Sequence, residues 1–270
     1  MENDDRPVGQ VLTRRDALKL LGIGSAAFLA ACASPEGTST IVPTVGSTTS
    51  SALDCVVRPE LTIGPYFVDE QLNRSDIRSD PLDGSVREGV PLTLKVDVFD
   101  VANSSCTPLQ GAQVDVWHCD AQGIYSGVSD QGFNTVGQQF LRGYQLTDAN
   151  GGVQFRTIYP GWYSGRAVHI HFMIRTTTEA SESYEFTSQF FFDDALTDQV
   201  YTQEAYAGKG ERNTRNDDDN IYMNGGDQLV LNVEGDNDNG YTATINIGLD
   251  LTDAEVGQPD TFRGGGGSPP

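Results

Sequence analysis

Basic residues are scarce in this chain. Lysine and arginine together number 17, against 38 aspartates and glutamates, so the formal net charge is −21 at pH 7. A surface of this sign repels phosphate groups, and we therefore expect no nucleic-acid partner. The acidity indicates a well-solvated surface or adaptation to a salty environment, and it says nothing more about function.

Long apolar runs are also scarce. The run at residues 20–31 is shorter than the roughly 20 residues that a membrane-spanning helix needs. Arg14 and Arg15 precede it, as in a twin-arginine export signal, and it leads into Leu-Ala-Ala-Cys at residues 29–32, which resembles the lipobox of bacterial lipoproteins. We predict that residues 1–32 are such a signal peptide and that Cys32 becomes acylated. The protein would then be exported and lipid-anchored to the membrane in the cell envelope, on its periplasmic or extracellular face.

The chain behind this signal divides by composition. Residues 33–52 consist largely of small and turn-forming residues and predict a flexible linker. Residues 53–262 hold the apolar patterns of one folded domain, and the Gly- and Pro-rich residues 263–270 predict a disordered tail.

Only four cysteines are present. With Cys32 used as an anchor, Cys55, Cys106 and Cys119 remain, which in an exported domain suggests one disulfide and one free thiol. We favour a Cys55–Cys106 disulfide because Cys119 lies in a strand-like segment, although the sequence does not prove the connectivity.

Apolar and polar residues alternate through much of the domain, which is typical of half-buried strands. Many short strands with little helix predict a mainly β protein, an antiparallel two-sheet β-sandwich with one short helix. We place that helix at residues 195–206, with Asp194 as its N-cap and Gly208 beyond its end. The predicted strands are residues 92–98, 111–117, 153–158, 167–174, 186–192, 228–233 and 241–251.

Only three histidines are present, and two of them stand together as His169-Ile170-His171. On a strand, residues two apart share a face, so both imidazoles should project the same way while Ile170, Phe172 and Ile174 fill the core. Tyr163 lies six residues earlier, after a Pro-Gly turn from which its side chain can reach back over the strand. This pattern suggests a metal site. A buried histidine pair with ordinary hydrogen bonds is the alternative for the bare His-x-His motif.

Several further motifs follow one another in a recognisable order. They are Gly-Pro-Tyr-Phe at residues 64–67, the segment 111–125, Arg142-Gly143, the Thr-Ile-Tyr-Pro-Gly-Trp-Tyr segment 157–163, Arg166, and His-Ile-His-Phe at 169–172. Together they resemble the intradiol ring-cleavage dioxygenases, the catechol and protocatechuate dioxygenase family, and most closely its exported branch. The resemblance covers roughly residues 55–250.

The resemblance implies a β-sandwich that holds non-haem Fe(III). Carried over, the iron ligands would be Tyr125, Tyr163, His169 and His171. Because a free tyrosine titrates near pH 10, a tyrosinate ligand at neutral pH needs a strong Lewis acid, and Fe(III) is one.

The resemblance also implies roles for the neighbouring side chains. Tyr163 would leave the iron and help to deprotonate the incoming diol, and Arg166 would stabilise negative charge on the ring. Gln189 matches a polar pocket residue. Pro65 and Tyr66 lie in a segment that resembles the family's entry segment and would form a substrate wall; a surface turn that covers one edge of the sandwich is the alternative for this loop. The partners are then a small catecholic substrate and O2, and the product is a muconate-type dicarboxylic acid. Which catechol is taken stays open, and so does the oligomeric state, a homo-oligomer being one option.

Two alternatives remain at this point. A cupin-like metal oxygenase also carries His-x-His on a strand, but its pattern requires a glutamate about four residues further, where this chain has threonines at 176–178 and Glu179. The other is a non-catalytic exported β-sandwich lipoprotein with a vestigial site.

Overall fold

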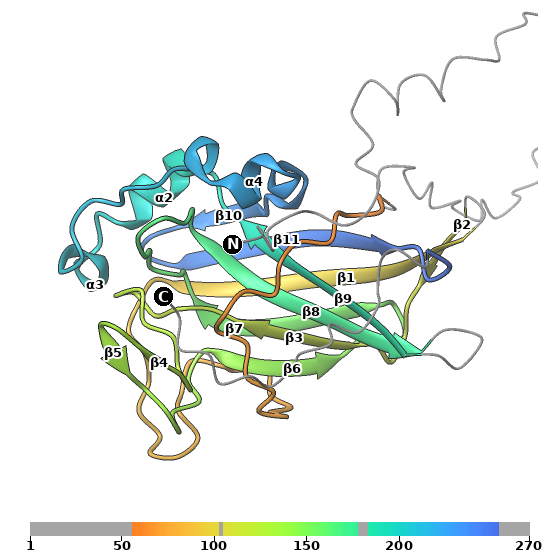
Figure 1. Cartoon of the computed structure of the whole chain (residues 1–270), viewed down its shortest axis with the longest axis horizontal. Coiled ribbons are helices and arrows are strands. Elements are labelled where there is room, and N and C mark those ends of the chain that lie inside the picture. The colour runs from red at the N-terminus through yellow and green to blue at the C-terminus, as the bar shows by residue number, and fades with distance from the viewer. Residues whose placement is uncertain (1–55, 103–104, 178–182, 254–270) are drawn as a thin grey trace, which may run out of the picture.

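The computed structural model describes residues 56–102, 105–177 and 183–253, which form two β-sheets packed face to face (Figure 1). The predicted signal peptide with Cys32, the linker, Cys55 and the tail lie outside the described residues. None of the helices in the described part is long and apolar enough to cross a membrane.

One sheet has five strands and is mixed. It contains β1 (Pro91–Ala102), β2 (Ser105–Pro108), β7 (Gly152–Ile158), β10 (Asn232–Asp236) and β11 (Gly240–Leu249). The order is β10-β11-β1-β2, and β7 also pairs with β1. The predicted fully antiparallel arrangement is wrong at one place, because β1 and β11 run parallel from Leu92↔Tyr241 to Asp100↔Leu249. A parallel pair needs a long crossover, and the whole second sheet lies between these two strands in the sequence.

The second sheet has four strands in the order β6-β3-β8-β9, all antiparallel to their neighbours. They are β6 (Arg142–Leu146), β3 (Gln113–Trp117), β8 (His169–Thr177) and β9 (Ser183–Phe191). A small hairpin of β4 (Ser129–Asp130) and β5 (Phe133–Asn134) stands apart from both sheets. Neither β6 nor this hairpin was predicted from the sequence.

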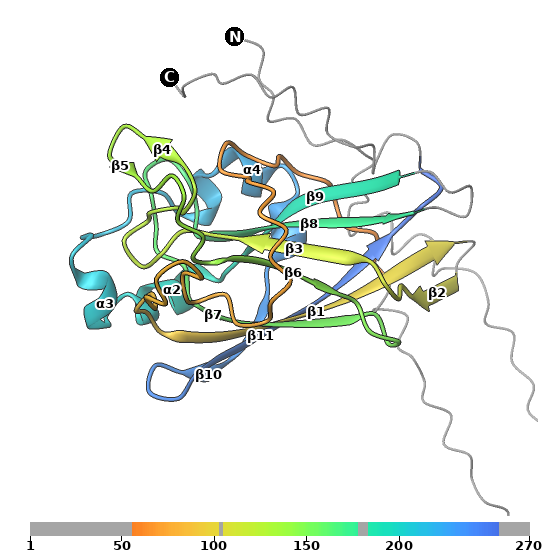
Figure 2. The same cartoon turned by 90° about the horizontal axis from the view of Figure 1, so that it is seen from below.

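The core lies between the two sheets, as the alternating pattern predicted (Figure 2). Leu94, Val96 and Val98 of β1 are fully buried there. They belong to the same core cluster as Ile170 and Phe172 of β8, which are also fully buried. Because β8 points these residues inward, the alternate residues of β8 lie on the outer face of the four-stranded sheet.

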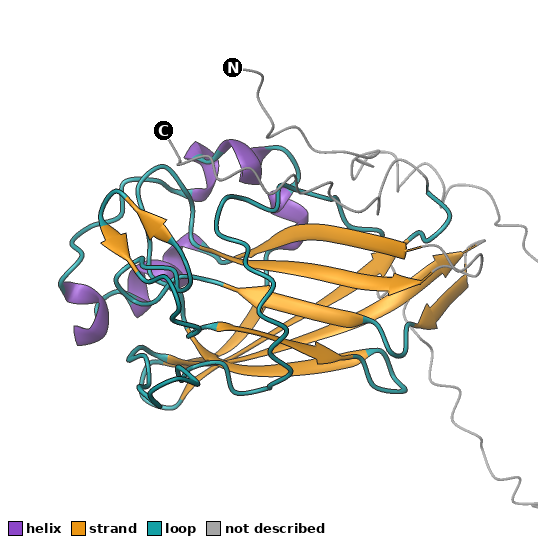
Figure 3. Cartoon of the chain, turned by 60° about the horizontal axis from the view of Figure 1, so that its bottom comes forward, coloured by secondary structure: helices purple, strands orange, loops and turns teal. Residues whose placement is uncertain are grey.

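The predicted helix is two helices. α2 (Asp194–Val200) is capped by Asp193, not Asp194, and α3 (Glu204–Ala207) follows after a break. The break brings two stacked tyrosines onto the chain after β7: Tyr201 donates to the Pro160 carbonyl and Tyr206 to the Tyr159 carbonyl. Three further short helices follow, η1 (Asn216–Asp218), α4 (Asn220–Met223) and η2 (Gly226–Leu229), and Figure 3 shows the helices gathered toward the end of the sandwich where the small hairpin lies.

The predicted strand 228–233 is also wrong in its first half. η2 occupies residues up to Leu229, and β10 begins only at Asn232. At Gly226 the backbone lies against the Phe191 ring so closely that a Cβ would come within 2.7 Å of it. The chain therefore packs on the end of β9 in a tight turn before it can enter the other sheet.

Residues 56–80 cross the outer face of the four-stranded sheet, over the alternate residues of β8 (Figure 2). Leu61 N–H donates to the Thr187 carbonyl on β9 at 2.9 Å, and Arg74 N–H donates to the Tyr144 carbonyl on β6 at 3.1 Å. The segment is thus hydrogen-bonded to both edge strands, β9 and β6, and covers the side chains on the outer face of this sheet.

Candidate metal centre

His169 and His171 lie under this cover at the start of β8. They are 2% and 0% exposed, and their Nε2 atoms are 3.0 Å apart. The Nδ1 of His169 is 2.7 Å from the Ala167 carbonyl, which can only accept a hydrogen bond. The proton of the neutral ring therefore belongs on Nδ1, and Nε2 of His169 presents its lone pair to the space between the rings.

Tyr125 reaches this point from the loop after β3. Asp120 closes the loop, because its carboxylate accepts from the Gln122 and Ile124 N–H groups. Gly123 supplies the positive φ of 79° that the turn requires. The Tyr125 ring is 1% exposed, and its hydroxyl oxygen lies 3.4 Å from His169 Nε2.

Tyr163 arrives from the loop between β7 and β8. The two tyrosine loops pack directly on each other: Gly161 N–H donates to the Asp120 carbonyl, and a Cβ at Gly161 would be 2.5 Å from that same oxygen. The Tyr163 hydroxyl lies 3.1 Å from His169 Nε2, and its ring is only partly buried. All four predicted ligands therefore come together.

Aromatic rings wall the cluster. Trp117 on β3 is the register partner of His171 and stacks on its ring with centroids 5.0 Å apart. Tyr66 stacks on Tyr125 at 4.4 Å and donates a 2.5 Å hydrogen bond to Asp130. Of the two predicted wall residues, Tyr66 thus touches a predicted ligand, whereas Pro65 is exposed at the tip of the covering segment. Trp117 was not predicted as a site residue, although its place opposite His171 follows from the pairing of β3 with β8.

Burial keeps these four side chains uncharged in the protein alone. It raises the pKa of Tyr125 well above 10, with nearby Tyr163 adding to the rise, and it raises the pKa of Tyr163 to about 12 against a smaller opposing effect of Arg166. Burial likewise lowers the pKa values of His169 and His171 well below 6.5. Two neutral imidazoles therefore face two phenols that lose their protons only beside a strong positive charge.

Mixed donors are the distinctive feature of this cluster. Within the described ranges no three His, Cys, Asp or Glu side chains group as a metal site. The arrangement instead offers two nitrogen and two phenolic oxygen atoms around one point, and such a set could hold a metal ion.

Arg166 and Gln189 lie beside the four donors, as predicted. The Arg166 Nη2 donates to Gln189 Oε1 at 2.5 Å, and Gln189 in turn donates to the Thr62 carbonyl of the covering segment at 2.9 Å. Arg166 Nε donates to Asp219 Oδ2 at 2.9 Å. Burial acts to lower the pKa of the guanidinium, but Tyr163 and Asp219 outweigh it and raise that pKa.

Asp219 was not predicted as a site residue. It precedes α4 as an N-cap, a local pattern that the sequence does contain. Its contact with Arg166 joins positions 53 apart in the sequence, and nothing in the local pattern indicates that contact.

Neither Cys106 nor Cys119 is one of the four donor residues. Cys106 is disulfide-bonded, and Cys119 is a buried free thiol 3.4 Å from the Gly161 carbonyl. Since Cys55 lies outside the described residues, its pairing with Cys106 stays a prediction.

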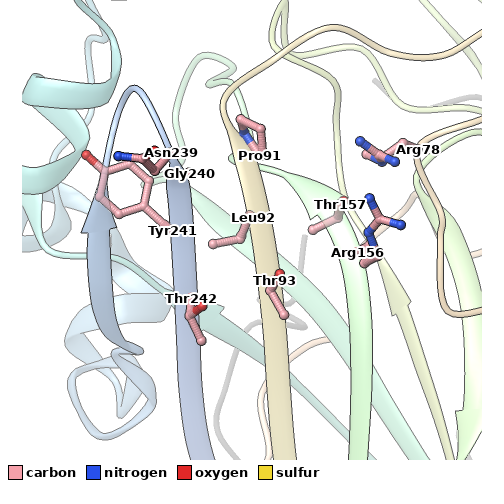
Figure 4. Close-up of a pocket in the computed structure, with 10 residues that line it drawn as sticks. All are labelled: Arg78, Pro91, Leu92, Thr93, Arg156, Thr157, Asn239, Gly240, Tyr241 and Thr242. Carbon is pink, nitrogen blue, oxygen red and sulfur yellow. The ribbon is translucent and has the colours of Figure 1, made fainter.

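A separate groove of about 180 Å³ lies on the five-stranded sheet and shares no residue with this cluster (Figure 4). Arg78 and Arg156 line it, and both lie near the carboxylate of Asp76, at 2.7 and 3.8 Å. The two arginines in this groove are therefore already paired with a carboxylate.

A protein-family match assigns the chain to a class of enzymes. The family described as Dioxygenase matches residues 62–241, so the chain belongs to this dioxygenase family. This membership decides against the cupin alternative.

Similar proteins of known structure or activity are also dioxygenases. An intradiol ring-cleavage dioxygenase from Tetranychus urticae is 29% identical, with a TM-score of 0.64 over 74% of this chain and 97% of its own. The dioxygenase domain of a carbohydrate-binding fusion from Streptomyces sp. SirexAA-E is also 29% identical, with a TM-score of 0.50 over 72% and 99%. A chlorocatechol 1,2-dioxygenase of Pseudomonas putida is 29% identical over 104 residues, 32% of this chain and 36% of that protein. The chain thus spans about a third of the length of that curated relative.

Proposed function

We propose that this protein cleaves a catecholic ring with O2 between its two hydroxylated carbons and releases a muconate-type dicarboxylic acid. The proposed cofactor is non-haem Fe(III), held by Tyr125, Tyr163, His169 and His171. The observation that carries this proposal is the convergence of two phenol oxygens and two imidazole nitrogens on one point, beside a partly buried arginine.

The donors fit such an ion. The Nε2 atoms of His169 and His171 are 3.0 Å apart, so one ion could bind both. Phenolates are hard anionic ligands, and burial leaves the phenols protonated unless a strong Lewis acid takes the place of the proton. When bound, Fe(III) would supply this Lewis acidity and activate the chelated diol toward O2.

Tyr163 is suited to accept a proton from the substrate. Its ring is partly exposed, whereas Tyr125 is 1% exposed and enclosed by its loop, so Tyr163 is the ligand with room to move. The phenolate of Tyr163, whose pKa burial raises to about 12, would be basic enough to take a diol proton at its Oη.

Arg166 supplies a fixed positive charge next to the donors. Its guanidinium remains charged, since Asp219 and Tyr163 raise its pKa. Negative charge that develops on the ring oxygen and carbon during the reaction would be stabilised by this preoriented cation. Gln189 holds the guanidinium on its other side through a 2.5 Å hydrogen bond.

The test begins with protein purified aerobically after expression in iron-replete medium. Tyrosinate bound to Fe(III) absorbs visible light, so we expect coloured protein with about one iron per chain. Catechol or hydroxyquinol should consume one O2 and give a muconate- or maleylacetate-type acid. The yellow semialdehyde of extradiol cleavage, or colourless protein with stoichiometric zinc, would contradict the proposal. Iron-loaded protein that consumes no O2 with any of several catechols would favour the non-catalytic alternative.

A further inference from the structure

Asp219 uses its two carboxylate oxygens for different purposes. Its side chain is 1% exposed and lies between η1 and α4. One oxygen, Oδ1, accepts from the Ile221 and Tyr222 N–H groups and caps α4. The other, Oδ2, accepts from Arg166 Nε at 2.9 Å and from the Ala167 N–H at 2.7 Å.

The second oxygen decides where the guanidinium of Arg166 lies. Together with the 2.5 Å hydrogen bond from Nη2 to Gln189, it holds the planar group at two separate nitrogens, which leaves it little freedom to rotate. The bond to the Ala167 N–H ties the same carboxylate to the backbone two residues before His169. One buried carboxylate thus sets the arginine relative to the strand that bears both histidines.

We propose that Asp219 is a positioning residue for ring cleavage, acting through Arg166, whose guanidinium it aims at the reacting ring. This inference rests on the proposed function of the metal centre. The segment of η1 and α4 would then take part in the reaction through Asp219, in addition to packing on the end of β9.

The two tasks of Asp219 can be separated by substitution. Asp219→Asn keeps an oxygen that can cap α4 but turns an NH2 group toward two donors, so it removes the contact with Arg166. Asp219→Ser also keeps a capping oxygen and is the second variant should the first fold poorly. Asp193→Asn is the matched control, since Asp193 caps α2 through the Ala195 and Leu196 N–H groups in the same way.

The experiment uses the iron-loaded, full-length protein. Iron content, the visible band, the thermal midpoint and the affinity for 4-nitrocatechol are measured beside kcat and KM for catechol. We expect Asp219→Asn to keep its iron and colour while kcat falls about 10²-fold, because misplacing a catalytic group by about 1 Å has an effect of this size. Asp193→Asn should leave kcat unchanged.

A double variant separates positioning from capping. If Asp219 acts through Arg166, then Asp219→Asn should cost no further activity in an Arg166→Gln background. A parental kcat in both Asp219 variants, or losses that multiply in the double variant, would overturn the inference while leaving the proposed function intact. Failure of the proposed function itself would show separately, as parent protein without iron-dependent O2 uptake.

Discussion

His118 differs from the other two histidines in what its ring nitrogens meet. Nδ1 lies 2.8 Å from the Cys119 carbonyl and Nε2 lies 2.6 Å from the Thr157 hydroxyl, so the neutral ring is satisfied on both sides. Burial lowers the pKa of His118 from 6.5 to about 4. Proximity in sequence to a site residue therefore does not make this histidine part of the metal centre.

This histidine predicts a pH dependence of stability. The unfolded chain takes up a proton at His118 below about pH 6.5, and the folded chain does so only below about pH 4, so stability falls as the pH falls through this window. The loss should reach about 3 kcal/mol at the lower end. Denaturant unfolding at several pH values between 7 and 4 should show a shallower decline for His118→Asn, which retains a donor for the Cys119 carbonyl. Parallel curves for the variant and the parent would contradict this assignment.

Gly64 gives a prediction about the metal centre itself. Its φ is +71°, and a Cβ there would come within 2.9 Å of His171 Cε1. Gly84 has nearly the same φ, +74°, but open space around it. Both Gly→Ala substitutions should cost about 1–2 kcal/mol in backbone strain, whereas only Gly64→Ala should push the His171 ring aside. Iron content and the visible band should therefore drop in Gly64→Ala alone, and an equal drop in Gly84→Ala would point to general destabilisation instead.

At the scale of elements, strands were easier to predict than helices for a physical reason. The alternation around His169 and His171 is local and is confirmed, because Ile170 and Phe172 belong to the core between the sheets while the two imidazoles meet on the other face. The break between α2 and α3 depends on where the Tyr201 and Tyr206 hydroxyls find carbonyl partners about 41 and 47 residues away in sequence. No pattern within residues 195–206 contains that information.

The docking of α3 can be tested through the same hydroxyl. Tyr206 donates to the Tyr159 carbonyl at 2.8 Å and accepts from the Val90 N–H at 3.0 Å, and its side chain is 3% exposed. Tyr206→Phe leaves two buried backbone groups without that partner and should lower the free energy of unfolding by about 2–4 kcal/mol. Tyr201→Phe removes one bond, to the Pro160 carbonyl, and should cost about 1 kcal/mol. Urea denaturation of both variants checks the order, which would be refuted by a larger loss for Tyr201→Phe.

At the scale of the whole molecule, the candidate site is assembled from distant segments. The four donors were predictable because they lie in three local motifs, one of which holds both histidines, and the resemblance orders those motifs. Asp219 and Trp117 were not predicted, because their roles arise from contacts across the fold with Arg166 and His171. The parallel pairing of β1 and β11 was missed for the same reason, since the direction of a returning strand is decided by everything between the two.

The location of the protein in the cell is predicted from the sequence alone, because residues 1–32 lie outside the described residues. We propose that residues 1–32 direct export and that Cys32 carries a lipid, because the twin arginines and the Leu-Ala-Ala-Cys motif flank a run too short to span a bilayer. Acyl chains hold a protein on a membrane by burying methylene groups, so losing their attachment site should release it. Cys32→Ala should therefore shift the protein from the membrane to the soluble fraction after cell fractionation, detected by immunoblot. Cys119→Ala, which removes a buried thiol of the domain, serves as the control and should stay with the membrane. Unchanged membrane partitioning of Cys32→Ala would refute the lipid anchor, whatever the activity of the domain proves to be.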